Sequence, residues 1–170
     1  MVKLQTALSI IETHYGQWRA KRSKVLLINH IHEGVSILQA LGASEDVQAA
    51  FCIHPLVQNS VSTKYPKDFT HIVHMAEMYT IYANTSLCTS EFDKITANLE
   101  SKLDKLPVMP TEIAYMLYAD KIQNYKDFKL YHYGTHENFN RLNRYFRLWI
   151  NYLIKRYDFT VKINTDNLIK

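Results

Sequence analysis

A few histidines and one aspartate are the side chains of this sequence best suited to chemistry. His30 and His32 fall in one predicted helix, where residues two apart point about 200° from each other, so only one can face a given site. His54 stands at the end of the next predicted helix and supplies a further imidazole. His71 and His74 lie three residues apart in a later helix and can share one of its faces.

Asp120 interrupts an apolar stretch that covers residues 114–119. A carboxylate in such surroundings is unfavourable unless it is paired, hydrogen-bonded or bound to a metal ion. Two explanations therefore stay open for this residue. It is either a structural carboxylate that pairs with Lys121 or a nearby histidine, or a ligand in a functional site.

The spacing of apolar residues predicts the helices that position these side chains. Gly42 suits the left-handed end of the second helix, and Ser44 is a predicted N-cap for the third. Pro55 is expected to end or kink that third helix. Residues 58–67 are expected to form a loop, and the tail after 158 a short strand or a docked extension. The predicted all-α fold has helices at about 4–18, 25–41, 44–55, 68–86, 90–106, 111–125 and 137–157.

Length and composition narrow the class of protein. A chain of 170 residues suits one domain, 1–170, whose core needs no disulfide or metal, and 4 Gly and 4 Pro are too few for a sandwich or barrel. The net charge of +4 is too small for a dedicated nucleic-acid binder. Cys52 and Cys88 lack metal-type spacing, which indicates a reduced, cytoplasmic protein. No apolar run approaches the ~18 residues of a membrane span, so no membrane association is expected.

Four motifs follow one another in the order found in HD-type phosphohydrolases: Asn29-His30, then residues 34–38, 49–54 and 119–124. The sequence most resembles the (p)ppGpp hydrolase domain of RelA/SpoT enzymes and their small metazoan SpoT-homologue relatives. His14, Gln17 and Arg19 stand where that family carries similar residues, and residues 144–149 resemble its terminal helix. The resemblance covers about residues 5–157, leaves 158–170 as an extension, and implies an HD-domain-like bundle of about seven to eight helices.

The resemblance also implies a metal site. In that family two histidines, the aspartate directly after the second one, and a later aspartate hold a divalent ion, usually manganese. Carried over, the ligands here are His30, His54 and Asp120. The ion lowers the pKa of a bound water to make a nucleophile, which needs such ligands and an open position. His71 and His74 match none of these ligands, so we expect them to be structural or pocket-lining.

Three acidic positions of the family are neutral in this sequence. Pro55 replaces the aspartate after the second histidine, and the family's acidic pair further along is Gln58-Asn59 here. Amides form hydrogen bonds but do not accept a proton as a general base near neutral pH. We therefore assign no catalytic residue and expect a poor hydrolase, with Mn²⁺ or another divalent ion only where the site is still active.

The absence of these three acidic side chains favours binding of an anion. A carboxylate ~6 Å from a phosphate charge would raise the free energy of binding by about 3 kcal/mol at an effective dielectric of ~20. We interpret the chain as a degenerate HD protein that binds and sequesters a phosphorylated nucleotide or nucleotide-derived signal. A composition rich in Tyr, Asn, Ile and Lys is typical of AT-rich genomes, which extends the hypothesis to alarmone binding or phage counter-defence. The expected ligand contacts are Arg19, Lys21, His30, His54, Gln58, Asn59, Lys121, Asn124 and Tyr145.

Two other functions stay open. One is an active metal-dependent phosphohydrolase of (p)ppGpp type, with a fourth ligand from elsewhere in the chain. The other is a protein-interaction module whose pocket is vestigial, in which residues 19–24 are a solvated basic linker. The last predicted helix has an apolar face that either closes the core or forms the interface of a homo-oligomer.

Overall fold

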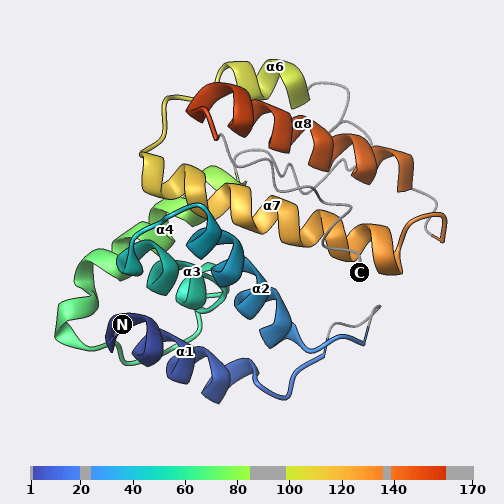
Figure 1. The fold of residues 1–170 in the computed structure, drawn as a ribbon. Helices are drawn as coiled ribbons and strands as arrows, with labels where there is room; N and C mark the ends of the chain where they lie inside the picture. Colours follow the sequence, from blue (N-terminus) through green and yellow to red (C-terminus); the bar gives the residue numbers. More distant parts are fainter. Residues whose placement is uncertain (1, 20–23, 85–98, 136–138, 160–170) are drawn as a thin grey trace.

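The computed structural model describes residues 2–19, 24–84, 99–135 and 139–159, and they form an all-α fold (Figure 1). Within these ranges there are seven α-helices, one short 3-10 helix and no β-strand, which confirms the predicted fold class. In chain order the elements are α1 (Val2–Tyr15), α2 (Leu27–Ala40), α3 (Glu45–Gln58), the 3-10 helix η1 (Lys67–Phe69), α4 (Thr70–Asn84), α6 (Leu99–Asp104), α7 (Thr111–Tyr131) and α8 (Phe139–Tyr157).

Helix α7 is the central element of the bundle. It packs against α8 on one side and against α2, α3 and α4 on the other (Figure 1). Residues 116–123 are buried without a break, including the polar residues Asp120, Lys121 and Gln123. A helix that is buried on all faces belongs to the core, so polar side chains there must find partners within the protein.

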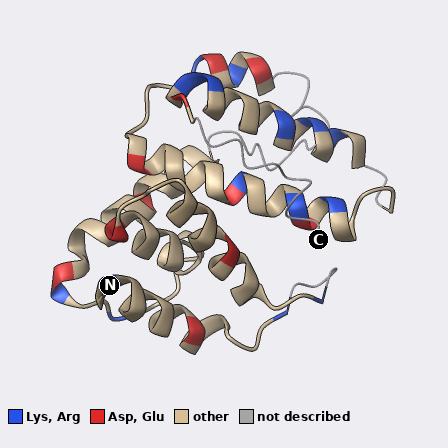
Figure 2. Cartoon of the chain, viewed as in Figure 1, with Lys and Arg blue, Asp and Glu red and all other residues tan. Residues whose placement is uncertain are grey.

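Helix α8 covers the outer side of α7. Tyr145, Trp149 and Leu153 recur every four residues on its buried face, while its charged side chains are all Lys or Arg (Figure 2). This spacing places the apolar face against α7 and leaves the basic residues toward solvent. Of the two roles expected for this apolar face, the described contacts place it in the core of the monomer.

A close approach of α2 to α3 brings two of the candidate histidines together. Gly34 packs directly on the ring of Phe51, and a Cβ added at this glycine would lie 2.1 Å from a ring atom. Real Cβ atoms do not approach so closely, so this position requires glycine. His30 lies one turn before Gly34, and its ring centroid is 5.6 Å from those of both Phe51 and His54.

Several predicted helix ends are confirmed. Gly42 ends α2 with a φ of +71°, and the Ser44 side chain accepts a hydrogen bond from the amide of Val47 at the start of α3. The first helix is shorter than predicted: it ends at Tyr15 rather than Trp18, just before Gly16, a residue type that disfavours helix. The helix predicted at 111–125 is longer than expected, because α7 continues past 125 to residue 131.

Of the two effects expected of Pro55, an end or a kink, the end is wrong, since α3 continues to Gln58. Proline lacks the amide N–H that would bond to the carbonyl four residues earlier, here that of Phe51. In this protein the imidazole of His54 takes the place of that N–H, with Nδ1 2.6 Å from the Phe51 oxygen. The buried carbonyl is therefore satisfied although the backbone bond is absent.

Other predictions fall partly or wholly outside the described residues. Of the helix expected at 90–106, residues 99–106 are described, and Leu99–Asp104 of them are helical. Lys21 and Cys88 lie outside the described residues. The expected tail strand also lies outside, apart from Phe159, which is buried against Tyr115 and Tyr118.

His71 and His74 are exposed on α4. Among the described helices, none has the length and apolar character needed to cross a membrane.

Candidate metal centre and cavity

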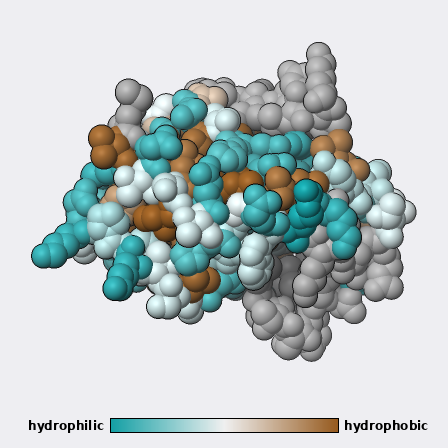
Figure 3. Space-filling view, turned by 90° about the horizontal axis from the view of Figure 1, so that it is seen from below, coloured by the Kyte–Doolittle hydropathy of each residue, from teal (hydrophilic) through white to brown (hydrophobic). Residues whose placement is uncertain are grey.

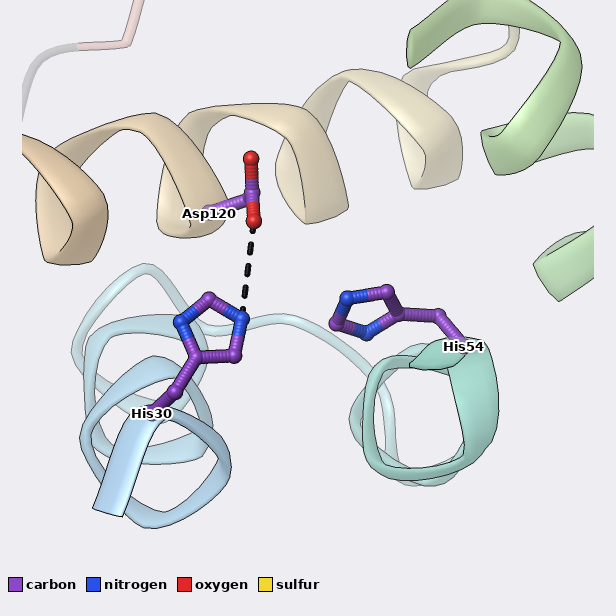
Figure 4. Close-up of side chains that lie close together, drawn as sticks. All are labelled: His30, His54 and Asp120. Carbon is purple, nitrogen blue, oxygen red and sulfur yellow. Dashed lines mark ion pairs between the residues drawn. The ribbon is translucent and has the colours of Figure 1, made fainter. Parts of the chain in front are cut away.

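Three side chains from three helices converge in the interior. His30 of α2, His54 of α3 and Asp120 of α7 each offer a ligand atom, and these atoms all lie within 4.8 Å of one another (Figure 4). The Nε2 atom of His30 is 3.5 Å from an Asp120 oxygen. His54 and Asp120 are buried, and His30 is half-buried. The structure thus brings together the three residues that the resemblance singled out.

The hydrogen bond of His54 fixes its tautomer. A carbonyl oxygen only accepts, so Nδ1 must carry the proton that bonds to Phe51, and Nε2 keeps a free lone pair. Burial, followed by the neighbouring His30, lowers the pKa of His54 to about 4. The ring is therefore neutral at pH 7, which is the form that binds a metal ion.

A second set of hydrogen bonds fixes the tautomer of His30. The amide nitrogen of Gln123 donates to Glu33 at 3.1 Å and to Asp127 at 2.9 Å, which turns the amide oxygen toward Nδ1 of His30. Lys126 in turn pairs with Glu33. Because the Gln123 oxygen accepts, Nδ1 of His30 donates, and in the neutral ring the Nε2 atom, 3.5 Å from an Asp120 oxygen, carries the lone pair.

Sequence reasoning missed Glu33, Gln123 and Asp127, although a signal was present. Glu33 follows His30 by three residues, Gln123 follows Asp120 by three, and Asp127 follows Gln123 by four. These spacings place polar residues on the helix faces that carry the two candidate ligands. Residues that orient metal-binding histidines are expected at such positions.

Asp120 is held by two donors on opposite oxygens. Lys121 donates to Oδ2 at 2.9 Å, and Asn124 donates to Oδ1 at 2.8 Å. Burial acts to raise the pKa of Asp120, but Lys121, His30 and His54 outweigh it and keep that pKa below its usual range. Burial and Asp120 hold the pKa of the Tyr79 phenol well above its usual value, so this neighbour stays neutral. The ionised carboxylate is therefore available as a ligand.

These donors fit a divalent transition-metal ion. With both rings neutral, two imidazole nitrogens and one carboxylate oxygen offer lone pairs within 4.8 Å of one another, the spacing at which one cation can contact all three. Histidine nitrogen with carboxylate oxygen suits Mn²⁺, Fe²⁺, Co²⁺ or Zn²⁺. Three protein ligands also leave coordination positions open for a further group.

A cavity of about 480 Å³ adjoins this centre. Six of the predicted site residues line it: His30, His54, Gln58, Asn59, Asp120 and Asn124. Gln123 and Asp127 add to the polar part of the wall, and Pro55 lines it next to His54. The remainder is apolar and aromatic, and comes from α1, the start of α2, the end of α7 and α8: Ile11, Tyr15, Val25, Leu26, Leu27, Ile31, Phe128, His132, Leu142 and Phe146.

The other predicted contacts lie away from the cavity wall. Arg19 is exposed and donates to the carbonyl of Lys24 at 2.9 Å. Lys121 is buried behind Asp120, where its ammonium group lies 5.6 Å from the ring centroid of Tyr145 and 5.7 Å from that of Trp149. Tyr145 is itself buried between α7 and α8. Lys121 therefore serves to hold Asp120 and not to line the cavity.

Comparison with known proteins gives no further guide to the site, since no family model, curated protein or solved structure matches the chain.

Figure 3 shows one face of the molecule, where apolar side chains of the described residues are scattered among polar ones. That face offers no single broad apolar patch of the kind that marks a protein interface. The centre and its cavity are thus the feature from which a function can be inferred.

Proposed function

We propose that this protein binds a divalent transition-metal ion through His30, His54 and Asp120 and sequesters a phosphorylated nucleotide in the adjoining cavity. The observation that carries the proposal is the preset geometry of the centre. Both histidines are fixed with Nδ1 protonated, so both direct a lone pair toward an ionised carboxylate. Such preorganisation by neighbouring groups is characteristic of metal-binding histidines.

The need for a bound cation follows from the charges of the cavity. None of the described residues that line it is a lysine or arginine, whereas Asp120 and Asp127 both contribute carboxylates. A phosphate group placed there would meet negative charge at short range, which is unfavourable at low dielectric. When bound, the metal ion supplies the positive charge that attracts the phosphate.

Two amide residues of the cavity wall, Gln58 and Asn59, support the retention of an intact ligand. Gln58 and Asn59 line the cavity where the resembling family carries acids, and an amide does not take a proton from water. Their amides also have partners: Gln58 donates to Asn84 at 3.4 Å, and Asn59 donates to the carbonyl of Pro55 at 2.7 Å. The chain thus provides ligand contacts at these positions without a general base.

A metal-dependent phosphohydrolase is the second candidate. Asp127 favours it, because this carboxylate lines the same cavity and could accept a proton. Its Oδ2 already accepts a hydrogen bond from Gln123, and its Oδ1 lies 3.9 Å from the ammonium group of Lys126, so both oxygens have protein partners. The binding function therefore has the stronger support.

The two functions separate in a deplete-and-release experiment. Protein is mixed with a panel that includes (p)ppGpp, nucleoside phosphates, NADPH and cyclic nucleotides, with and without Mn²⁺, then denatured, and every species is quantified. Sequestration predicts that a ligand leaves the free pool only with Mn²⁺ and returns unchanged on denaturation. Products that form only with metal would instead establish the hydrolase, and no uptake of any ligand would contradict both.

Matched variants show whether the centre is responsible. Asp120→Asn keeps the shape of the side chain but removes its charge, so uptake should be lost. His32→Ala is the control, because His32 lies on the same helix but is exposed, with Glu12 3.8 Å away. Uptake that survives in Asp120→Asn would place the ligand elsewhere.

A further inference from the structure

The cavity wall has a distinct distribution of charge and shape. The polar end, as named here, is the part of the wall formed by the candidate metal ligands, four amides and Asp127, and the apolar end is the part formed by apolar side chains and the rings of Tyr15, Phe128 and Phe146. Apart from the centre itself, His132 is the one described lining side chain able to gain a positive charge. A ligand must match one positive centre at one end and an apolar wall at the other.

The charge at the polar end limits the number of phosphate groups. Lys121 already offsets the charge of Asp120, so a divalent ion leaves two net positive charges at the centre, while Asp127 adds a negative charge nearby with Lys126 at 3.9 Å. The amides of Gln58, Asn59 and Asn124 can donate further hydrogen bonds but add no charge, whereas Gln123 already donates to Glu33 and Asp127. One phosphate monoester, with a charge of about −2 near pH 7, matches this centre, whereas each further phosphate would find no lysine or arginine among the described lining residues.

The apolar end indicates what the phosphate is attached to. Tyr15 and Phe146 are half-buried, so part of each ring remains exposed. A nucleobase has two flat faces that stack on aromatic rings, and it gains from leaving water. The volume of about 480 Å³ is within the range of pockets that hold compact organic ligands.

We infer that the ligand is a nucleoside monophosphate, selected over the corresponding di- and triphosphates and over phosphates without an aromatic body. This inference rests on the proposed function, since the metal-bound centre is what holds the phosphate. It goes further by assigning specificity to two parts of the wall. Asp127 opposes additional phosphate groups, and the aromatic end recognises the base.

The test is equilibrium dialysis of the full chain with AMP, ADP, ATP, GMP, GDP, GTP and glycerol phosphate, at one fixed concentration of free Mn²⁺. Bound Mn²⁺ is measured in every sample, so that loss of metal is separated from loss of nucleotide. We expect AMP or GMP to bind at least tenfold more tightly than its triphosphate and than glycerol phosphate. A triphosphate that binds as tightly as the monophosphate overturns the inference.

Asp127→Asn is the variant that tests the cause of the selectivity. The asparagine oxygen can still accept from Gln123, so His30 keeps its orientation, while one negative charge leaves the cavity wall. The preference for monophosphate over triphosphate should shrink severalfold while Mn²⁺ binding is unchanged, and an unchanged preference overturns the role of Asp127. Bound Mn²⁺ without any bound nucleotide would overturn the inference but leave the metal centre standing, whereas absence of bound Mn²⁺ would overturn the proposed function itself.

Discussion

The imidazole of His54 donates from Nδ1 to the carbonyl oxygen of Phe51 across 2.6 Å, within a single turn of α3. That oxygen is available because residue 55 is proline and has no N–H to offer it. The residue that removes a ligand of the resembling family therefore also orients a ligand that remains. The effect of Pro55 on the centre is structural as well as chemical.

Replacing Pro55 by alanine should change metal affinity and stability in opposite directions. Alanine restores an N–H that competes with His54 for the Phe51 carbonyl, so metal affinity should fall by about 10- to 100-fold. Alanine is also the better helix former, by up to about 3 kcal/mol in a helix interior, so the Tm of the metal-free protein should rise. Calorimetric titration with Mn²⁺ and thermal unfolding measure the two effects, and an unchanged affinity would remove Pro55 from this role.

Gln123→Leu should weaken metal binding through His30. The leucine removes the acceptor for Nδ1 of His30, so the ring loses its fixed tautomer and affinity should fall by about 10- to 100-fold. The ¹⁵N chemical shifts of the ring should show mixed tautomers in the variant and one in the parent. Gln48→Leu is the matched control, because Gln48 lies in the first turn of α3, where it donates to the carbonyl of Ala43, and it does not line the cavity. Equal losses in both variants would argue for a general structural effect.

Acid should destabilise the metal-free protein through His54. Its pKa is about 4 when folded and 6.5 as the reference value, so the unfolded chain binds more protons between these values. The stability this neutral ring contributes is complete above pH 6.5 and is lost as the pH falls toward 4. Between pH 7.5 and 4.5 the loss should be on the order of 2 kcal/mol.

Urea unfolding at both pH values, with a chelator present, measures this loss. His54→Gln provides the comparison, since glutamine does not titrate and other groups contribute equally to both proteins. The variant should lose less stability on acidification than the parent. Identical losses would mean that folding does not lower the pKa of His54.

Gly34→Ala should destabilise the bundle and disturb the centre together. The added methyl group would lie 2.1 Å from an atom of the Phe51 ring, so this ring, which also lies against His30 and His54, must shift. Overpacking of this kind costs about 1–3 kcal/mol, and the shift of the ring disturbs both histidines. Ser36→Ala on the exposed face of the same helix should change stability by less than about 0.5 kcal/mol. Equal unfolding free energies for Gly34→Ala and the parent would contradict the close packing.

Much of the fold and the three ligand candidates could be predicted from the sequence, because both depend on local spacing. Apolar periodicity indicates a helix wherever one face is buried, and Asp120 stood out as a lone carboxylate in an apolar run. Pro55 misled the prediction because the usual helix-breaking rule considers the backbone alone. It does not include a side chain that satisfies the orphaned carbonyl, as His54 does here.

The direction of side chains on α7 was harder to predict. Lys121 was expected to contact a ligand, but successive residues on a helix point about 100° apart, so it faces α8 when Asp120 faces α2 and α3. Which of the two faces meets the cavity depends on how the helices pack. The roles of Gln123 and Glu33 could not be predicted for the same reason, because their hydrogen bond forms only where α2 and α7 pack side by side.

Metal stoichiometry tests the central claim most directly. The purified chain is stripped with a chelator, dialysed against Mn²⁺ or Zn²⁺ at several free concentrations, and its bound metal is counted by elemental analysis. We predict one ion per chain, lost in each of His30→Ala, His54→Ala and Asp120→Asn and kept in His32→Ala. Failure of the parent to hold one ion, or equal binding by all four variants, would contradict a metal centre at these residues.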